Sequence, residues 1–509
     1  MPSSSAPGTP STIGTSSVES TSTGDTPPTH RIDLSLAPRA RYASLVAEYA
    51  PRLRSITSIF DTLVLDIFPE SYLRWIKALA RVFLRRVYDD EETEEIRGIA
   101  ETTGIEVYLV VCLNVLLDLL MGCTSGAALY KPGHGDGDGL LGGGEEGDAR
   151  MLHFRTLDWD MPALRQLLVT LEFVESDEPS APVVARSVTY VGFVGILTGV
   201  RPGLSVSLNF RPNHDDTSWV KNFKYYGRHL LVLLGCKRSI PSMLRQTIVP
   251  SRPGKPSWFS YLFSYLLIWK RYRTQQPMNT LPLKSTVSHI LSTPSTACYL
   301  ILSDGRESYV LEKDYKTTTV ESSTSFIVAT NNDRDVATPQ ATEHSSRQEH
   351  TGASLTVAGD PVLLVDFIKD SIERRACMQA NWDIKVTRAR QAARRASQAS
   401  SISFGSSSQA RSDPLRRTRS SRREGQTTDN NQTQDSAPAT TTATASIASA
   451  AQPEVTASLE ELVTWTSRYP TTNEMTHFAT ILDPMRGTVA WIKRYLEPLE
   501  CSWELTDFE

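Results

Sequence analysis

The first ordered part of the chain, residues 27–122, has a pattern typical of one short strand followed by helices. The stretch RIDLSLAPRARYASLVAEY begins with alternating apolar and polar positions and continues with helical spacing. Its last segment, IEVYLVVCLNVLLDLLMG, is apolar nearly all round, which is typical of a membrane span or of a buried core helix. Because it carries Glu106, Asn114 and Asp118 and is barely long enough to cross a bilayer, we favour the buried helix.

From Cys123 onward the pattern changes to that of β-strands. Short segments rich in β-branched and aromatic residues follow one another, separated by turn residues. These segments are CTSGAALY, ARMLHFRTL, QLLVTLEFV, PVVARSVTYVGFVGI, LSVSLNF, TACYLILSD, ESYVLEKD and SFIVAT. A Gly- and Asp-rich stretch, KPGHGDGDGLLGGGEEGDA, separates the first two as a loop. Helices followed by a run of antiparallel strands predict an α+β fold.

Polar tracts set the boundaries of the ordered regions. Residues 1–26 are rich in Ser, Thr and Pro, and residues 384–455 are first basic and Ser-rich, then Thr- and Ala-rich; both compositions predict disorder. Order returns where Ser458 and Glu461 have the spacing of a capping box at a helix start, and GTVAWIKRYLEP predicts a final strand. The ordered parts are then the helical residues 27–122, the core at 123–383 and the C-terminal part of that core at 456–509.

Composition and charge exclude several classes of protein. The chain of 509 residues carries a formal net charge of −4, without the basic excess of a nucleic-acid-binding protein, so no nucleic-acid partner is expected. Its six cysteines lie far apart, without zinc-site or CxxC spacing, so we expect neither a metal nor another cofactor. The first residues lack a basic and apolar leader, so we predict no signal peptide.

Cys123 lies where the apolar helical segment meets the first strand, directly after Gly122. If the bond between these two residues is cut, Cys123 carries both a thiol and a free α-amino group. An α-amine has a pKa of about 7.7–8.0, so it serves as a proton acceptor near neutrality without a histidine. The alternative is a cysteine that merely fills space at the end of a buried helix.

Two further stretches carry polar groups that suit amide hydrolysis. HFRTLDWD places Arg155 and Asp158 on or just past the next strand, and a guanidinium near sulfur favours the thiolate. Three residues apart on a regular strand, the two side chains face opposite ways, so both reach one site only if the strand breaks near Leu157. FIVATNNDRD places Asn331 just after an apolar strand, where an amide is a suitable oxyanion donor or an ordinary turn residue.

Taken in order, these motifs resemble the acid ceramidase and N-acylethanolamine acid amidase family of N-terminal nucleophile hydrolases. The resembling pieces are PPTHRIDLSLAPRARY, CTSGAALY, HFRTLDWDM, YVGFVGILTGVRPGLSVSLNFR, CYLILSDGRESYVLEKD, ATNNDRD and TILDPMRGTVAWIKRYL. The resemblance implies an αββα sandwich. It also implies that self-cleavage between Gly122 and Cys123 divides the protein into an N-terminal α chain and a C-terminal β chain.

The resemblance also implies roles for individual residues. Cys123 matches the nucleophile, Arg155 and Asp158 match the Arg and Asp beside it, and Asn331 matches the oxyanion-hole Asn. IERRACM suggests Arg374 as a further family arginine. One departure stands out: Phe210 occupies the place of an acidic residue that helps the family's site and self-cleavage. Animal members of the family are lysosomal or secretory, whereas the missing signal peptide leaves cytoplasmic and membrane-peripheral locations open.

The sequence therefore predicts a ceramidase-like amidase without a cofactor, acting on ceramide or another N-acyl amide lipid. Its rivals are an N-acylethanolamine amidase and, because of Phe210, an unprocessed and inactive lipid-binding relative. SWFSYLFSYLLIWKRYR, residues 257–273, is either an interfacial helix that contacts a membrane or a helix that covers the sheet. Its candidate substrate-contacting residues are Trp258, Phe259, Phe263 and Trp269.

Overall fold

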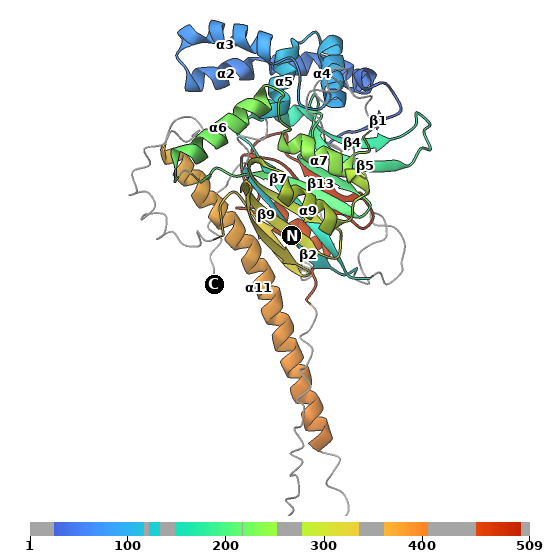
Figure 1. The fold of residues 1–509 in the computed structure, drawn as a ribbon. Coiled ribbons are helices and arrows are strands. Elements are labelled where there is room, and N and C mark those ends of the chain that lie inside the picture. Colours follow the sequence, from blue (N-terminus) through green and yellow to red (C-terminus); the bar gives the residue numbers. More distant parts are fainter. Residues whose placement is uncertain are drawn as a thin grey trace, which may run out of the picture. The chain divides into compact units, whose positions relative to one another are not determined.

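The computed structural model describes residues 25–116, 122–132, 148–215, 217–251, 277–334, 361–405 and 455–499. Within the main body, two β-sheets pack face to face, and helices lie on their outer faces and at one end (Figure 1). The body comprises residues 1–382 and 456–509, and residues 383–455 form a separate unit.

The larger sheet has eight strands in the order β1-β4-β5-β6-β7-β8-β9-β10. Their bounds are β1 (Thr29–Asp33), β4 (Leu168–Val174), β5 (Val183–Tyr190), β6 (Thr198–Arg201), β7 (Leu204–Phe210), β8 (Ser295–Ser303), β9 (Ser308–Tyr315) and β10 (Thr317–Ser323). All neighbours are antiparallel except β1, which pairs with β4 in parallel. The first strand of the chain is thus paired with β4, which lies beyond Cys123 in the sequence. More than a hundred residues separate β1 from β4.

The smaller sheet is antiparallel, with the order β11-β2-β3-β12-β13. Its strands are β2 (Gly122–Tyr130), β3 (Arg150–Asp158), β11 (Phe326–Ala329), β12 (Thr476–Asp483) and β13 (Thr488–Arg494). Every residue of β3 and β12 is buried, because the larger sheet covers one face and helices cover the other. Cys123, the second residue of β2, pairs with Leu157 on β3 and is buried as well.

The helices fall into three groups. Those that precede Cys123 lie at one end of the sandwich: α1 (Ala43–Ser55), α2 (Ser58–Ile67), α3 (Glu70–Phe83), α4 (Asp90–Thr103) and α5 (Val107–Leu116) (Figure 1). On the outer face of the larger sheet lie α6 (Trp219–Leu233), α7 (Ile240–Ile248) and α9 (Leu283–Ser292). On the side of the smaller sheet lie α12 (Leu459–Ser467) and the first half of α11 (Pro361–Gly405). Short 3₁₀ turns, η1 (Pro38–Ala40), η2 (Pro162–Leu167) and η3 (Met278–Thr280), connect these elements.

As far as the structure describes the apolar segment before Cys123, it is a largely buried helix, α5, as predicted, and residues 117–121 lie outside the described residues. Its one deeply buried amide, Asn114, donates to the carbonyl of Gly192 at 2.9 Å and accepts from the backbone N–H of Val194 at 2.8 Å. These bonds tie α5 to the segment after β5, so the polar residue is satisfied inside the core. In the described part of the chain, no helix has the length and hydropathy to span a bilayer.

The fold class predicted from the sequence, an α+β sandwich of αββα type, is confirmed. The capping box is also present, since Ser458 and Glu461 exchange their side-chain and backbone bonds at the start of α12. Three strands were not predicted: β6 is only four residues long, β10 is a polar edge strand with mostly exposed side chains, and β12 lies between the predicted C-terminal helix and the predicted final strand. The segment after β5 is not strand, because the backbone turns at Gly192 with φ +92°.

The predicted disorder from residue 384 onward is wrong for its first part, because α11 continues as helix to Gly405. The stretch RARQAARRASQAS is rich in Ala, Arg and Gln, which have high helix propensity, so it extends a helix already nucleated by packing further upstream. The tail, the Gly/Asp-rich loop, residues 257–273 with their four candidate aromatics, and residues 406–454 lie outside the described residues.

Candidate active site

Cys123, the second residue of β2, lies between the two sheets and is fully buried. The sulfur accepts a hydrogen bond from Nη2 of Arg155 at 3.4 Å and lies 3.9 Å from the carbonyl oxygen of Leu208 on β7. Burial raises the pKa of the thiol to about 11, although Arg155 acts to lower it. The thiol is thus protonated in the uncut chain.

Arg155 reaches the sulfur from the neighbouring strand. It pairs with Ser125 across β2 and β3, so its side chain points to the same face of the sheet as that of Cys123. Its Nη1 donates to the carbonyl of Leu197 at 2.9 Å, which fixes the guanidinium in place. Burial lowers the pKa of Arg155, and the neighbouring thiol opposes that shift.

Asn331 forms a hydrogen bond with the backbone nitrogen of Cys123. The backbone N–H of Cys123 donates to Oδ1 of Asn331 at 2.7 Å, while Nδ2 of Asn331 donates to the carbonyl of Phe210 at 2.8 Å. The N–H of Asn331 itself donates to the hydroxyl of Ser371 on α11 at 2.7 Å. Gly126 permits this arrangement, because a Cβ there would lie 2.2 Å from the carbonyl oxygen of Ile327, and β11 could not approach β2.

Arg374 joins Asn331 to Asp158. Its Nη2 donates to Oδ1 of Asn331 at 3.1 Å, and its Nη1 forms a buried ion pair with Asp158. The other carboxylate oxygen of Asp158 accepts from the hydroxyl of Thr476 at 2.6 Å. Burial raises the pKa of Asp158, and Arg374 is the main group that opposes this shift. A chain of polar contacts thus runs from the nitrogen of Cys123 to a buried carboxyl group.

The structure brings together Cys123, Arg155, Asp158, Asn331 and Arg374, with Gly122 opposite Asp158 in the pairing of β2 and β3. The expected condition, a strand break near Leu157, is wrong. Strand β3 runs unbroken to Asp158, and the irregularity lies in β12, whose register shifts between Thr476 and Phe478.

The two predicted side chains do face opposite ways, and each serves a different atom of the cysteine. Arg155 contacts the sulfur from the inner face of the sheet, whereas Asp158 is linked to the nitrogen through Arg374 and Asn331.

Phe210, the residue expected to stand where the family has an acidic residue, contacts the site through its backbone. Its carbonyl accepts from Asn331, and its backbone acts to lower the pKa of the Cys123 thiol. Its ring packs against Phe367 on α11, with ring centroids 6.4 Å apart. The next residue, Arg211, forms a two-pronged ion pair with Asp333, both distances being 2.8 Å.

The sequence analysis did not identify Thr476 and Ser371 as residues of the site. Thr476 contacts Asp158, and Ser371, one helical turn before Arg374, holds the backbone of Asn331. For Ser371 a signal exists in its spacing of three residues from Arg374, which places both on one helix face. Among the described residues, no cluster of His, Cys, Asp and Glu side chains is arranged to hold a metal ion.

Comparison with known proteins supports the motif-based assignment. The family model described as the beta subunit of N-acylethanolamine-hydrolyzing acid amidase matches residues 25–88, which precede Cys123. Acid ceramidase of Mus musculus is 30% identical over 199 residues, which are 36% of this chain and 45% of the relative. Acid ceramidase of Homo sapiens is 26% identical with the same coverage. The chain thus spans less than half the length of the curated relatives that it matches.

Among solved structures, the Caenorhabditis elegans ortholog of N-acylethanolamine-hydrolyzing acid amidase matches at 15% identity and a TM-score of 0.36, over 71% of this chain and 93% of that chain. The family-model match and the acid ceramidase relatives confirm the resemblance found in the motifs. This chain is therefore similar to members of the acid ceramidase and N-acylethanolamine acid amidase family.

Proposed function

We propose that the protein is a self-maturing amidase that hydrolyses the amide bond of N-acyl lipids, ceramide by preference, with Cys123 as its nucleophile. The observation that carries this proposal is that separate side chains bind the two reacting atoms of Cys123. The guanidinium of Arg155 donates to the sulfur, and the side-chain carbonyl of Asn331 accepts from the nitrogen. Arg374 contacts this Asn331 oxygen and forms an ion pair with Asp158. An N-terminal nucleophile needs both atoms placed, because the nitrogen is its base.

Maturation begins when the thiol of Cys123 adds to the carbonyl carbon of Gly122. The C–N bond breaks, the nitrogen takes up the thiol proton, and Gly122 is left as a thioester on sulfur. Water then hydrolyses the thioester, which frees the carboxyl end of the N-terminal chain and restores the thiol. The nitrogen that now donates to Asn331 becomes the α-amine of the mature enzyme.

In turnover, the thiol gives its proton to this α-amine while the sulfur adds to the lipid's amide carbonyl. The ammonium returns the proton to the leaving nitrogen as the C–N bond breaks, so the sphingoid amine departs and a fatty acyl thioester remains. Water hydrolyses that thioester. Asn331 is the proposed oxyanion donor together with backbone N–H groups, and that role requires its Nδ2 to leave the carbonyl of Phe210 after the cut.

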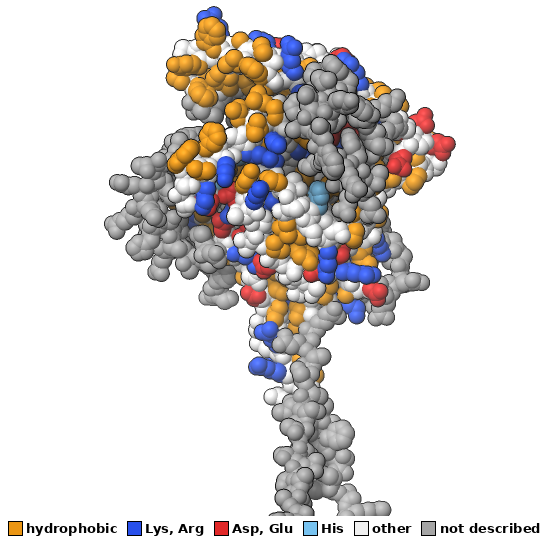
Figure 2. Space-filling view, in the orientation of Figure 1, with side chains coloured by type: hydrophobic (Ala, Val, Ile, Leu, Met, Phe, Trp, Pro, Cys, Tyr) orange, Lys and Arg blue, Asp and Glu red, His pale blue; other side chains and the backbone are white. Residues whose placement is uncertain are grey.

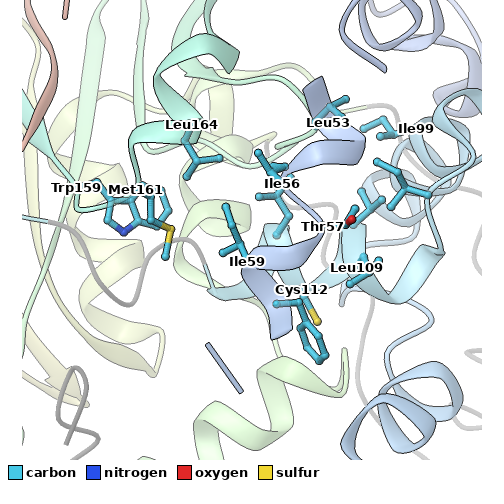
Figure 3. Close-up of a pocket in the computed structure, with 15 residues that line it drawn as sticks. Leu53, Ile56, Thr57, Ile59, Ile99, Leu109, Cys112, Trp159, Met161 and Leu164 are labelled. Atoms are coloured by element: carbon cyan, nitrogen blue, oxygen red, sulfur yellow. The ribbon is translucent and has the colours of Figure 1, made fainter. Parts of the chain in front are cut away.

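An apolar pocket supports a lipid acyl chain as the substrate. Its cavity volume is about 80 Å³, within about 730 Å³ of space between the atoms that includes open solvent. Trp159 and Met161, which follow Asp158, form one wall, and the side chains of Ile56, Ile59 and Leu109 form another (Figure 3). Nearly the whole lining is hydrocarbon, which is typical of sites for apolar ligands.

The outer face of α3 supports contact with a membrane. Its large apolar side chains are exposed, Trp75 with 72% of its surface accessible, and hydrophobic atoms gather over α2 and α3 (Figure 2). The exposed members are Leu65, Phe68, Tyr72, Trp75, Leu79, Val82 and Phe83. Exposed apolar surface of this extent is typical of a membrane or protein contact.

Side-by-side turnover of ceramide and an N-acylethanolamine by the purified protein tests the proposed reaction. The account predicts hydrolysis of both lipids, faster for ceramide, and none by Cys123→Ala. Faster hydrolysis of the ethanolamine lipid favours the amidase alternative. Binding of both lipids without hydrolysis by an intact chain favours the inactive relative that the loss of the acid at Phe210 suggests, and it refutes the proposal.

A further inference from the structure

A buried cluster of charged side chains joins the helices before the cut to the helices after it. From the N-terminal side come Arg41, which follows η1, and Glu92 and Glu95 on α4. From the C-terminal side come Ser242 and Arg245 on α7. All five are buried, so the cluster lies inside the contact between the two future chains.

Direct bonds cross this contact. Nη2 of Arg245 donates to Oε1 of Glu95 at 2.7 Å, and the hydroxyl of Ser242 donates to Oε1 of Glu92 at 2.8 Å. On the N-terminal side, Arg41 donates to the same oxygen of Glu95 at 2.8 Å. Nη1 of Arg245 also contacts the hydroxyl of Tyr42 at 3.3 Å.

The charges of the cluster do not balance if every group is ionised. Two guanidinium groups, of Arg41 and Arg245, face the carboxyl groups of Glu91, Glu92 and Glu95. Glu91 and Glu95 each contact a guanidinium, whereas the carboxyl group of Glu92 accepts from the neutral hydroxyl of Ser242. A buried anion without its own cation is costly, so Glu92 is the group that keeps a proton.

The electrostatic surroundings of Glu92 agree with this assignment. Burial raises the pKa of Glu92 to about 8; Arg245 and the hydroxyl of Ser242 act to lower it, while Asp89 and Glu95 raise it further. At the rim, Asp89 is paired with Arg238 at 3.3 Å, which again joins the two sides of the cut. The cluster is thus neutral in acid and carries one excess negative charge in alkali.

We propose that this cluster makes the association of the two chains pH-dependent. The association is strong in acid and weakens as the pH rises toward 8, because Glu92 must then lose its proton inside the contact. The inference rests on the proposed self-cleavage, since an uncut chain cannot separate. The pairing of β1 with β4 also crosses the cut, but it is made of backbone hydrogen bonds and does not titrate.

The direction in which pH changes the stability of the contact follows from proton linkage. The pKa of Glu92 is higher in the joined state than the ordinary value of 4.5, so the joined state binds more protons. The stabilisation is fully present below the ordinary pKa and is lost as the pH rises toward about 8. Between pH 5 and pH 8, the equilibrium constant for separation or unfolding is expected to rise on the order of a hundredfold through this group.

The first test uses the uncut full-length protein with Cys123→Ala, so it does not depend on catalysis. Urea unfolding at pH 5 and pH 8 is compared with and without Glu92→Gln, which keeps the shape of the protonated side chain. The unfolding constant is expected to rise between the two pH values on the order of a hundredfold more without the substitution than with it. Equal pH dependence in the two proteins overturns the proposal.

Two further variants separate titration from packing. Glu101→Gln lies on the same helix in an exposed pair with Arg39 and is expected to leave the pH dependence unchanged. Glu95→Gln removes the acceptor shared by Arg41 and Arg245 and is expected to destabilise the protein at both pH values. A Glu101 variant that flattens the pH dependence as Glu92→Gln does refutes the assignment to the cluster.

The second test uses the self-cleaved protein in gel filtration at pH 5 and pH 8. Co-elution of the two chains at pH 5, and their separation at pH 8 at protein concentrations where the Glu92→Gln chains stay together, is the expected result. Chains that separate equally in both proteins overturn the proposal. If no cleavage occurs, the proposed function fails, and the unfolding comparison on the uncut chain still decides whether the cluster titrates as described.

Discussion

Arg374→Met is expected to destabilise the protein strongly, because it breaks the buried pair with Asp158. The two side chains are 3% and 2% exposed, and the carboxylate of Asp158 is left with the hydroxyl of Thr476 when the guanidinium is lost. Breaking a buried ion pair by removing one partner costs about 3–5 kcal/mol. Methionine keeps the length and helix propensity of the side chain, so the loss reports on the charge rather than on the helix.

Urea unfolding of the uncut Cys123→Ala protein at pH 7.5 measures this loss. A matched control is Arg97→Met, which breaks a pair with Glu94 whose side chains are 40% and 37% exposed. Exposed pairs contribute about 0.2–1 kcal/mol, so the control is expected to lose several-fold less stability.

Two further results sharpen the test. Adding Asp158→Asn to Arg374→Met removes the unpaired buried charge, so the double variant is expected to be more stable than the sum of the single effects predicts. The loss in Arg374→Met is also expected to be smaller at pH 5, because burial raises the pKa of Asp158 and the protonated carboxyl needs no cation. A loss as small as that of Arg97→Met, or strictly additive effects, would refute the described pair.

Three other changes test separate parts of the site. Gly122→Val is expected to slow self-cleavage at least tenfold, since a Cβ at this position would lie 3.2 Å from Cβ of Asp158 and 3.3 Å from Nη1 of Arg374. The ratio of intact to cut chain on gels measures the rate, and cleavage at the normal rate would contradict the described packing. Alkylation of the uncut chain by iodoacetamide at pH 7, mapped by mass spectrometry, is expected to modify the exposed Cys236 and to leave Cys123 unmodified. Burial excludes the reagent from Cys123 and raises the pKa of its thiol to about 11. Rapid modification of Cys123 would show that the site is open before the cut. Leu109→Trp fills part of the apolar pocket and is expected to lower kcat/KM for long acyl chains more than for short ones, in turnover assays with a matched series of lipids; an equal loss for all chain lengths would place the acyl chain elsewhere.

The fold was largely predictable because most strands are buried and carry apolar residues at alternating or consecutive positions. Strand β7 coincides with the segment LSVSLNF, every residue of which is buried. The polar edge strand β10 escaped prediction because it buries little and so leaves no hydrophobic pattern. The helical extension of α11 escaped because composition alone does not distinguish a charged helix from a disordered basic tract.

The site was predictable only where family motifs named the residues. Spacing along β3 correctly placed Arg155 and Asp158 on opposite faces, but it gave no way to see how the second one joins the site. That link is Arg374, which is 216 residues from Asp158, and the supporting hydroxyl of Thr476 is 318 residues away. Contacts between residues so far apart depend on the topology, and local periodicity carries no information about them.

Mass spectrometry and N-terminal sequencing of the purified protein, incubated at mildly acidic pH beside Cys123→Ala, test the central claim most directly. The account predicts a new N-terminus at Cys123 in the unaltered protein and a single intact chain in the variant. An intact chain in both, at every pH from 4 to 8, would contradict a self-exposed nucleophile and would favour a lipid-binding protein without hydrolytic activity.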